Sequence, residues 1–220
     1  MTSELDGSIL DPVSTSNPVT EWPHRPLGTV AERIFLGLAD ARQRGDGEER
    51  ELPLLNVRDL RDGHVPPAGE LAKRAVPLDA DIERYTVHAE DVVITCRGTQ
   101  LKVANIAPAS DGALISSNLI AVRAGADLLP AVLLAFLQSP AGQKALVQRG
   151  RSSTSSLSLT PKAVGELSIP VPPLAVQRQI AELVTAAEQT YVAAIRAAEQ
   201  RRAIAHAVAV DLLRGEPRPG

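Results

Sequence analysis

A hydroxyl-rich segment between basic residues has the composition best suited to bind a charged ligand. Residues 151–162, RSSTSSLSLTPK, hold five serines and two threonines between Arg151 and Lys162. Hydroxyl groups both donate and accept hydrogen bonds, so together with flanking cations they can hold phosphate oxygens. A solvated surface loop has a similar composition. The segment by itself leaves polyanion binding and a plain loop as equal alternatives.

The charge distribution favours the same part of the chain. Residues 1–90 carry a net charge of −7, residues 91–166 carry +3 and residues 167–220 carry +1, within a formal total of −3. No acidic residue lies between Asp127 and Glu166. A surface that faces phosphate groups and an ordinary solvated basic face both fit this excess of cations.

Residues suited to catalysis or metal binding are scattered along the chain. His24, His64, His88 and His206 form no pair at metal-ligand spacing, and Cys96 is the single thiol. Because Cys96 lies in an apolar run, we expect a buried structural thiol. The glycine motifs of nucleophile elbows, phosphate loops and dinucleotide sites are absent from the sequence. The sequence therefore predicts a binding protein without a catalytic, metal or cofactor site of its own.

Nothing in the sequence indicates export or membrane insertion. One cysteine cannot form an internal disulfide, and the first residues do not resemble a signal peptide. No apolar run approaches the roughly 20 residues that a membrane span needs. We expect a cytoplasmic protein.

The hydrophobic pattern predicts four segments: a disordered lead-in over 1–20, a mixed α+β domain over 21–172, a long helix over 173–214 and a tail over 215–220. Within the domain, Val30, Ile34 and Leu38 have helical spacing. The other expected elements are a buried strand in 52–60, two short strands in 84–98 broken at 89–91, a strand pair at 101–106 and 117–122, a helix that ends before Pro140, a second that ends at Gly150, and a strand before the prolines.

Three prolines separate the domain from the long helix. In residues 168–184, SIPVPPLAVQRQIAELV, Pro170, Pro172 and Pro173 restrict the backbone just before a helical pattern. Proline fixes φ and is tolerated in the first turn of a helix, so the order predicts a strand, a rigid elbow and a helix. From Leu174 to Arg214 there is no glycine or proline, which allows a helix of about 60 Å.

This helix carries a seven-residue repeat that we call the seam. It is apolar except at Arg201, and its alanines permit a close approach of two helices. A helix that packs on its own domain is the alternative, because alanine favours any helix. The seam consists of Ile180, Val184, Ala187, Tyr191, Ala194, Ala198, Arg201, Ala205, Val208 and Leu212.

In their order, these motifs resemble the DNA-specificity subunits of type I restriction-modification systems. The segments LLNVRDLRDG, GTQLKVANI, SSNLIAV, LLAFLQSPAGQKAL and GRSSTSSLSLTPKAVGELSIPVPPLAVQRQIAELV follow the order of a target-recognition domain and its conserved helix. The PPLxxQxxI element at the elbow is fairly specific, and the resemblance covers roughly residues 27–214. Where the family usually has glutamate and an Asn-Gln pair, this chain has Val176 and an Asn118 followed by leucine. The missing glutamate leaves the start of the helix and partner docking open.

The resemblance implies a non-catalytic subunit that reads half of a bipartite site in double-stranded DNA. An adenine-specific DNA methyltransferase subunit would bind the helix and supply the S-adenosylmethionine chemistry, and a restriction or translocase subunit is a further possible partner. The chain has room for one recognition domain and one helix. We therefore expect a homodimer, or a pair with another half-subunit, joined by an antiparallel coiled coil. An assembly scaffold that has lost DNA reading is the alternative.

The resemblance also implies which residues contact DNA. They lie on the turn after the central strand, on the hydroxyl-rich loop with its flanks, and on an early segment that carries weaker candidates. These residues are Arg97, Thr99, Gln100 and Lys102, then Arg149, Arg151, Ser152, Ser153, Thr154 and Lys162, and finally Arg58, Arg61 and Arg74.

Overall fold

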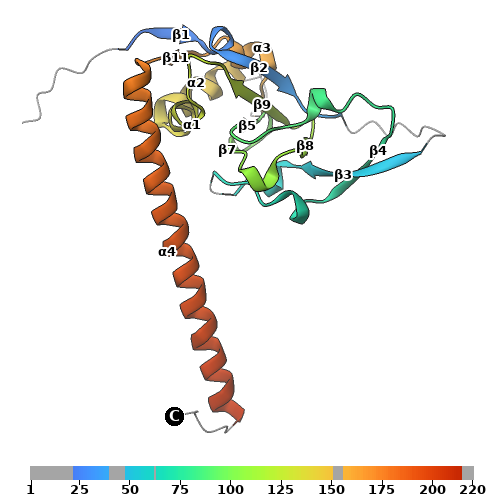
Figure 1. The fold of residues 1–220 in the computed structure, drawn as a ribbon, viewed down its shortest axis with the longest axis vertical. Coiled ribbons are helices and arrows are strands. Elements are labelled where there is room, and N and C mark those ends of the chain that lie inside the picture. The colour runs from blue at the N-terminus through green and yellow to red at the C-terminus, as the bar shows by residue number, and fades with distance from the viewer. Residues whose placement is uncertain (1–21, 40–47, 62, 151–155, 215–220) are drawn as a thin grey trace, which may run out of the picture.

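A mixed α+β domain followed by one long helix makes up the protein (Figure 1). The computed structural model describes residues 22–39, 48–61, 63–150 and 156–214 of the 220-residue chain. The lead-in expected over 1–20 and the tail over 215–220 lie outside the described residues. The predicted fold class is confirmed for the domain and the long helix.

A four-stranded antiparallel sheet forms the centre of the domain. Its order is β2 (Ala31–Leu36), β9 (Leu119–Ala124), β5 (Val92–Thr95) and β7 (Val103–Asn105). Side chains of a strand alternate between the faces of a sheet, so Ile94 and Ile120 enter one core while Val93 and Ala121 enter the other. The two central strands are therefore mostly apolar, with Thr95 and Arg123 near their ends as the polar residues.

Helices cover one face of this sheet and strands cover the other (Figure 1). On the first face lie α1 (Pro130–Gln138), α2 (Pro140–Gly150) and α3 (Pro161–Gly165). On the second lies a three-stranded sheet in the order β4 (Lys73–Pro77), β3 (Glu49–Leu55) and β8 (Leu114–Ile115). Two short antiparallel pairs join β1 (His24–Pro26) to β11 (Ser168–Pro170) and β6 (Arg97–Gly98) to β10 (Leu157–Ser158).

The prediction of a helix from the spacing of Val30, Ile34 and Leu38 is wrong. A short 3-10 turn, Leu27–Thr29, leads directly into strand β2. Ile34 packs against the core under the helices, whereas its neighbour Phe35 enters the opposite core. Because β2 pairs with β9, both of its faces are covered, and the extended chain buries apolar side chains that a helix would place on one side.

Several predicted strands are present with different partners or limits. Strands β7 and β9 fall where a pair was expected, but β5 lies between them. The first half of the 84–98 segment forms a 3-10 turn, Glu83–Tyr85, and a single bridge from Thr86 to Leu114. Strand β3 ends at Leu55, before another 3-10 turn at Val57–Asp59. In both places, a 3-10 turn stands where the sequence predicted part of a strand.

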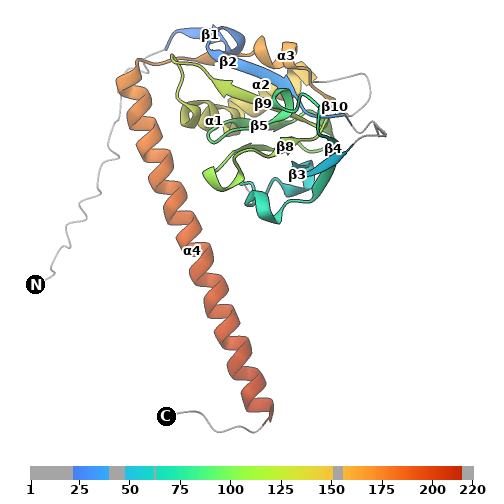
Figure 2. The same cartoon turned by 45° about the vertical axis from the view of Figure 1, so that its right-hand side comes forward.

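The helices and the elbow agree with the prediction. Helix α1 ends before Pro140, α2 ends at Gly150, and β11 enters the proline elbow. Helix α4 (Leu174–Arg214) then runs for 41 residues and extends far beyond the domain (Figure 2). None of the helices in the described ranges is both long and apolar enough to cross a membrane.

Candidate nucleic-acid interface

A tight turn between β5 and β7 presents the first group of predicted contact residues. The buried Thr95 builds it: its hydroxyl donates to the Gln100 carbonyl at 3.0 Å and accepts from the Lys102 backbone N–H at 2.8 Å. Gly98 has a φ of +114°, a conformation that other residues rarely adopt. Arg97, Thr99 and Gln100 are exposed on this scaffold. A buried framework therefore holds a polar turn in solvent.

The hydroxyl-rich segment returns to this turn. Strand β10 pairs with β6, which places Ser158 opposite Arg97 and Leu157 opposite Gly98. The Leu159 N–H also donates to the Cys96 carbonyl at 2.8 Å. Two segments far apart in the sequence are thus adjacent. The candidates Arg151, Ser152, Ser153 and Thr154 lie outside the described residues.

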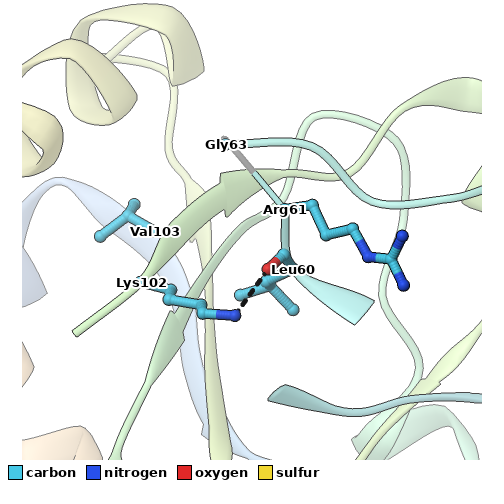
Figure 3. Close-up of a pocket in the computed structure, with 5 residues that line it drawn as sticks. All are labelled: Leu60, Arg61, Gly63, Lys102 and Val103. Atoms are coloured by element: carbon cyan, nitrogen blue, oxygen red, sulfur yellow. Dashed lines mark hydrogen bonds between the residues drawn. The ribbon is translucent and has the colours of Figure 1, made fainter. Parts of the chain in front are cut away.

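Lys102 fastens a neighbouring basic segment to the turn. Its ammonium donates to the Leu60 carbonyl at 2.9 Å (Figure 3) and to the Val57 carbonyl at 3.3 Å. Arg61 is exposed on the segment that Lys102 holds, and its guanidinium extends away from Lys102 (Figure 3). The backbone contacts occupy the Lys102 ammonium, so the structure gives this residue a positioning role. Its direct contact with DNA stays a prediction.

Arg58 and Arg61 border this group on the same segment. Arg58 is largely exposed and lies 3.7 Å from an Asp59 carboxylate oxygen, while Asp59 itself accepts from the Asn56 backbone N–H. Arg61 lines a shallow pocket of about 450 Å³ together with Lys102 and Val103. The structure therefore unites these two weaker candidates with the 97–102 turn.

Three other candidates lie elsewhere. Arg149, at the end of α2, forms an ion pair with Glu166 at 2.7 Å, with side chains 44% and 49% exposed. It also donates to the Glu166 carbonyl, so it joins α2 to the end of α3. Lys162 is exposed on α3, and Arg74 lies on β4 in the outer sheet. Their contact with DNA stays a prediction, but these residues belong to other elements.

Gln177 is a functional candidate that the sequence analysis passed over. It is the buried residue of α4, 1% exposed, and it accepts from the Leu129 N–H at 2.8 Å. Its amide donates to the carbonyls of Asp127 and Pro172. In the sequence, Gln177 is the glutamine of the PPLxxQxxI element, whereas its neighbour Val176 is only half-buried. Gln177 therefore attaches the start of α4 to the domain by hydrogen bonds, and this attachment does not depend on a glutamate at position 176.

The seam of α4 divides into a covered and an open part. Ile180 packs against the domain core and Val184 is half-buried. From Ala187 onward the seam residues are exposed, including Tyr191 at 45% and Leu212 at 61%. The domain thus covers only the first turns of the seam.

A second polar cluster stabilises the domain away from the turn. Arg123 forms two 2.9 Å hydrogen bonds with Asp91, which is 2% exposed. Nearby, His88 bridges Glu83 and Asp111. The hydrogen bond with Glu83 is the main reason why the pKa of His88 is above its ordinary value, although burial opposes it. These contacts tie surface turns to the sheet.

The described residues show no grouping suited to a metal ion. No set of three or more histidine, cysteine or acidic side chains within them is arranged so that it could hold a metal ion. The Cys96 thiol is fully buried, and this burial raises its pKa, so the unreactive protonated form is favoured. The expectation of a structural thiol is confirmed.

Comparison with solved structures shows which fold this architecture has. One chain, from a study of complex assembly and conformational transition in the type I R-M system, has 23% sequence identity and a TM-score of 0.57; the match covers 90% of this chain and 46% of that one. The HsdS subunit from Thermoanaerobacter tengcongensis has 24% identity and a TM-score of 0.53, with 94% and 48% covered. This chain has the HsdS fold. It spans about half the length of the two solved chains.

The likeness to HsdS is one of structure. No protein-family model matches the sequence, and neither does any curated protein. The fold implied by the sequence resemblance is nevertheless confirmed over the domain and the long helix.

Proposed function

We propose that this chain is a non-catalytic DNA-recognition subunit of a type I restriction-modification complex. It reads one half of a bipartite site in double-stranded DNA, and a partner adenine-N6 methyltransferase modifies that site. The observation that carries the proposal is the match of one domain and one helix to half of an HsdS fold. The proposal is consistent with an assembly that acts in the cytoplasm in defence against phage.

The turn on the sheet supplies a chemically suitable reading surface. Arg97, Thr99 and Gln100 are exposed together on a hairpin whose backbone is fixed from below by Thr95. Arginine and glutamine can each make paired hydrogen bonds to base edges in the major groove, whereas hydroxyls and cations bind phosphates. The paired strand β10 brings Ser158 to the same edge. A rigid turn that carries both kinds of group supports sequence reading.

The open part of the seam supports pairing with a second copy. Consider two α4 helices, antiparallel, with a two-fold axis beside Arg196. Ala194 then faces Ala198 of the partner subunit, and Tyr191 faces Arg201 of the partner subunit. Small residues meet small residues, and the one charge of the seam lies against an aromatic ring, a favourable cation–π pair. The two-fold dimer would rebuild a full-length equivalent with two recognition domains, whose site is palindromic around a nonspecific spacer.

Methylation in a cell tests the whole proposal. The chain is expressed with the methyltransferase encoded beside it in a host free of other adenine methylation, and the methyltransferase alone is the control. We expect a split palindromic motif only when both proteins are present. A split asymmetric motif would contradict the homodimer and indicate pairing with another half-subunit. If no methylated motif depends on this chain, the result would contradict DNA reading and favour an assembly scaffold.

Binding of duplex DNA tests the reading surface separately. Arg97→Ala should weaken binding and lower the dependence of affinity on salt by about one counterion. Lys73→Ala, an exposed change on β4 in the outer sheet, is the matched control. Equal affinities and salt slopes for both variants would contradict the assignment of Arg97.

A further inference from the structure

Two contacts between helix α4 and its own domain lie well apart along the helix. The first is the elbow, where Gln177 binds the backbone of Asp127 and Leu129, just before α1, and that of Pro172. The second is a contact between Glu188 on α4 and His64 on the domain. Glu188 lies 11 residues after Gln177, or about 17 Å along the helix axis at 1.5 Å per residue. Two anchors this far apart can fix a direction, which one anchor cannot.

The domain side of the second contact is rigidly held. Arg61 and His64 exchange backbone hydrogen bonds of 3.0 and 2.8 Å across a narrow turn. Gly63 in this turn has a φ of +82°, and a side chain there would collide with the Gln138 amide at the end of α1. The Gly63 carbonyl also accepts a hydrogen bond from the Asn105 N–H. Backbone hydrogen bonds therefore tie His64 to Arg61, and Gly63 to strand β7.

The same turn is connected to the proposed reading surface. The Leu60 carbonyl, next to Arg61, accepts from the Lys102 ammonium, and Lys102 closes the 97–102 turn through Thr95. A short chain of contacts thus links Glu188 on the helix to the exposed residues that we expect to meet DNA. Neither His64 nor Glu188 belongs to the seam or to the exposed residues 97–100 of that turn, so both lie outside the two proposed surfaces.

We propose that His64 and Glu188 are positioning residues that set the angle between α4 and the reading surface. This inference rests on the proposed function for its consequence: in a dimer joined through α4, this angle determines the distance between the two reading surfaces. The contact therefore specifies the length of the spacer between half-sites, and the bases of each half-site are read elsewhere. The elbow and the contact between His64 and Glu188 together attach α4 to the domain at two points, which we call the two-point attachment.

Distances between spin labels test the attachment without any reference to DNA. Labels go on cysteines at Gly69, where a side chain meets no atom within 4 Å, and at Ala203, exposed on the far half of α4. Native Cys96 is fully buried and does not compete for label. Labelled chains are diluted with unlabelled chains so that only distances within one copy are measured. The intact contact should give one narrow distance distribution.

His64→Ala and Glu188→Ala should each broaden this distribution, and the double variant should broaden it no further. His64→Gln, which keeps a side-chain N–H donor, should restore part of the narrow distribution. The matched control is Glu182→Ala, an exposed acid on the same helix. Distributions for His64→Ala and Glu188→Ala that are as narrow as the control's would overturn the two-point attachment.

Methylation then tests the consequence for DNA. In the complex, Glu188→Ala should keep the half-site bases and methylate sites with more than one spacer length. A single unchanged spacer despite a broadened distance distribution would overturn the link to spacing. If no motif depends on the chain even with Glu188 present, the proposed function fails, while the distance measurements still decide the attachment.

Discussion

The domain and the long helix differ in how much of their apolar surface is buried within this chain. The domain buries both faces of its central sheet, so Val92, Val93, Ile94 and Ile120 are all inaccessible to solvent. Helix α4 has a single buried residue, Gln177, and large apolar side chains such as Leu183 and Leu212 are 72% and 61% exposed. A helix usually gains its stability from packing an apolar face. The domain therefore buries its apolar surface within one chain, whereas the described part of the chain leaves most of the apolar stripe of α4 uncovered.

A charge in the seam should affect the helix and leave the domain intact. We expect Ala194→Glu to convert the dimer to a monomer, because each new carboxylate would be buried against Ala198 of the partner subunit. Light scattering measures the mass, and thermal unfolding measures the domain. Ala193→Glu, exposed but outside the seam, is the control. An unchanged mass for Ala194→Glu would remove the paired-helix proposal.

Loss of the buried ion pair should affect the domain in isolation from the helix. Arg123→Ala leaves the buried Asp91 carboxylate without its partner, which should lower the free energy of unfolding by about 3–5 kcal/mol. The exposed pair of Arg25 and Asp127 offers the control, since Arg25→Ala should change it by about 0–1 kcal/mol. Urea denaturation measures both. Similar losses for the two variants would contradict the role assigned to burial.

A substitution at Gln177, which joins the domain to α4, should lower the free energy of unfolding by an intermediate amount. Gln177→Ala removes three hydrogen bonds to backbone groups, two of them on the segment before α1. Unsatisfied buried groups should lower the free energy of unfolding by about 1–3 kcal/mol. Gln179→Ala, exposed two residues later, is the control. Equal stability of the two variants in urea would show that the elbow prolines alone hold the joint.

The smallest effect should come from His88 at the surface of the domain. Its hydrogen bond with Glu83 raises its pKa above 6.5, so its stabilising contribution is complete below this value and is lost as the pH rises through the higher folded pKa. We expect the Tm of the wild type to exceed that of His88→Gln at about pH 6 by more than at about pH 8. A constant difference across this range would contradict the bridge.

Local signals in the sequence were sufficient for the helices and the joint. Pro140 stops α1, the prolines at 172 and 173 precede α4, and the absence of glycine and proline allows α4 to run from Leu174 to Arg214. Backbone restriction acts within a few residues of a proline. For the same reason, the sequence predicted the elbow without knowledge of any distant contact.

Contacts between segments far apart in the sequence decided the strands and the surroundings of the charged side chains. The spacing of Ile34 fits a helix, but pairing with β9 made this segment a strand. The charges of Lys102 and Arg149 look alike in the sequence, yet one binds backbone carbonyls and the other binds Glu166. By itself, the sequence determined the composition of the turn and the repeat of the seam. Only the tertiary structure decided which cations stay exposed, because that depends on acceptors that the fold brings from far along the chain.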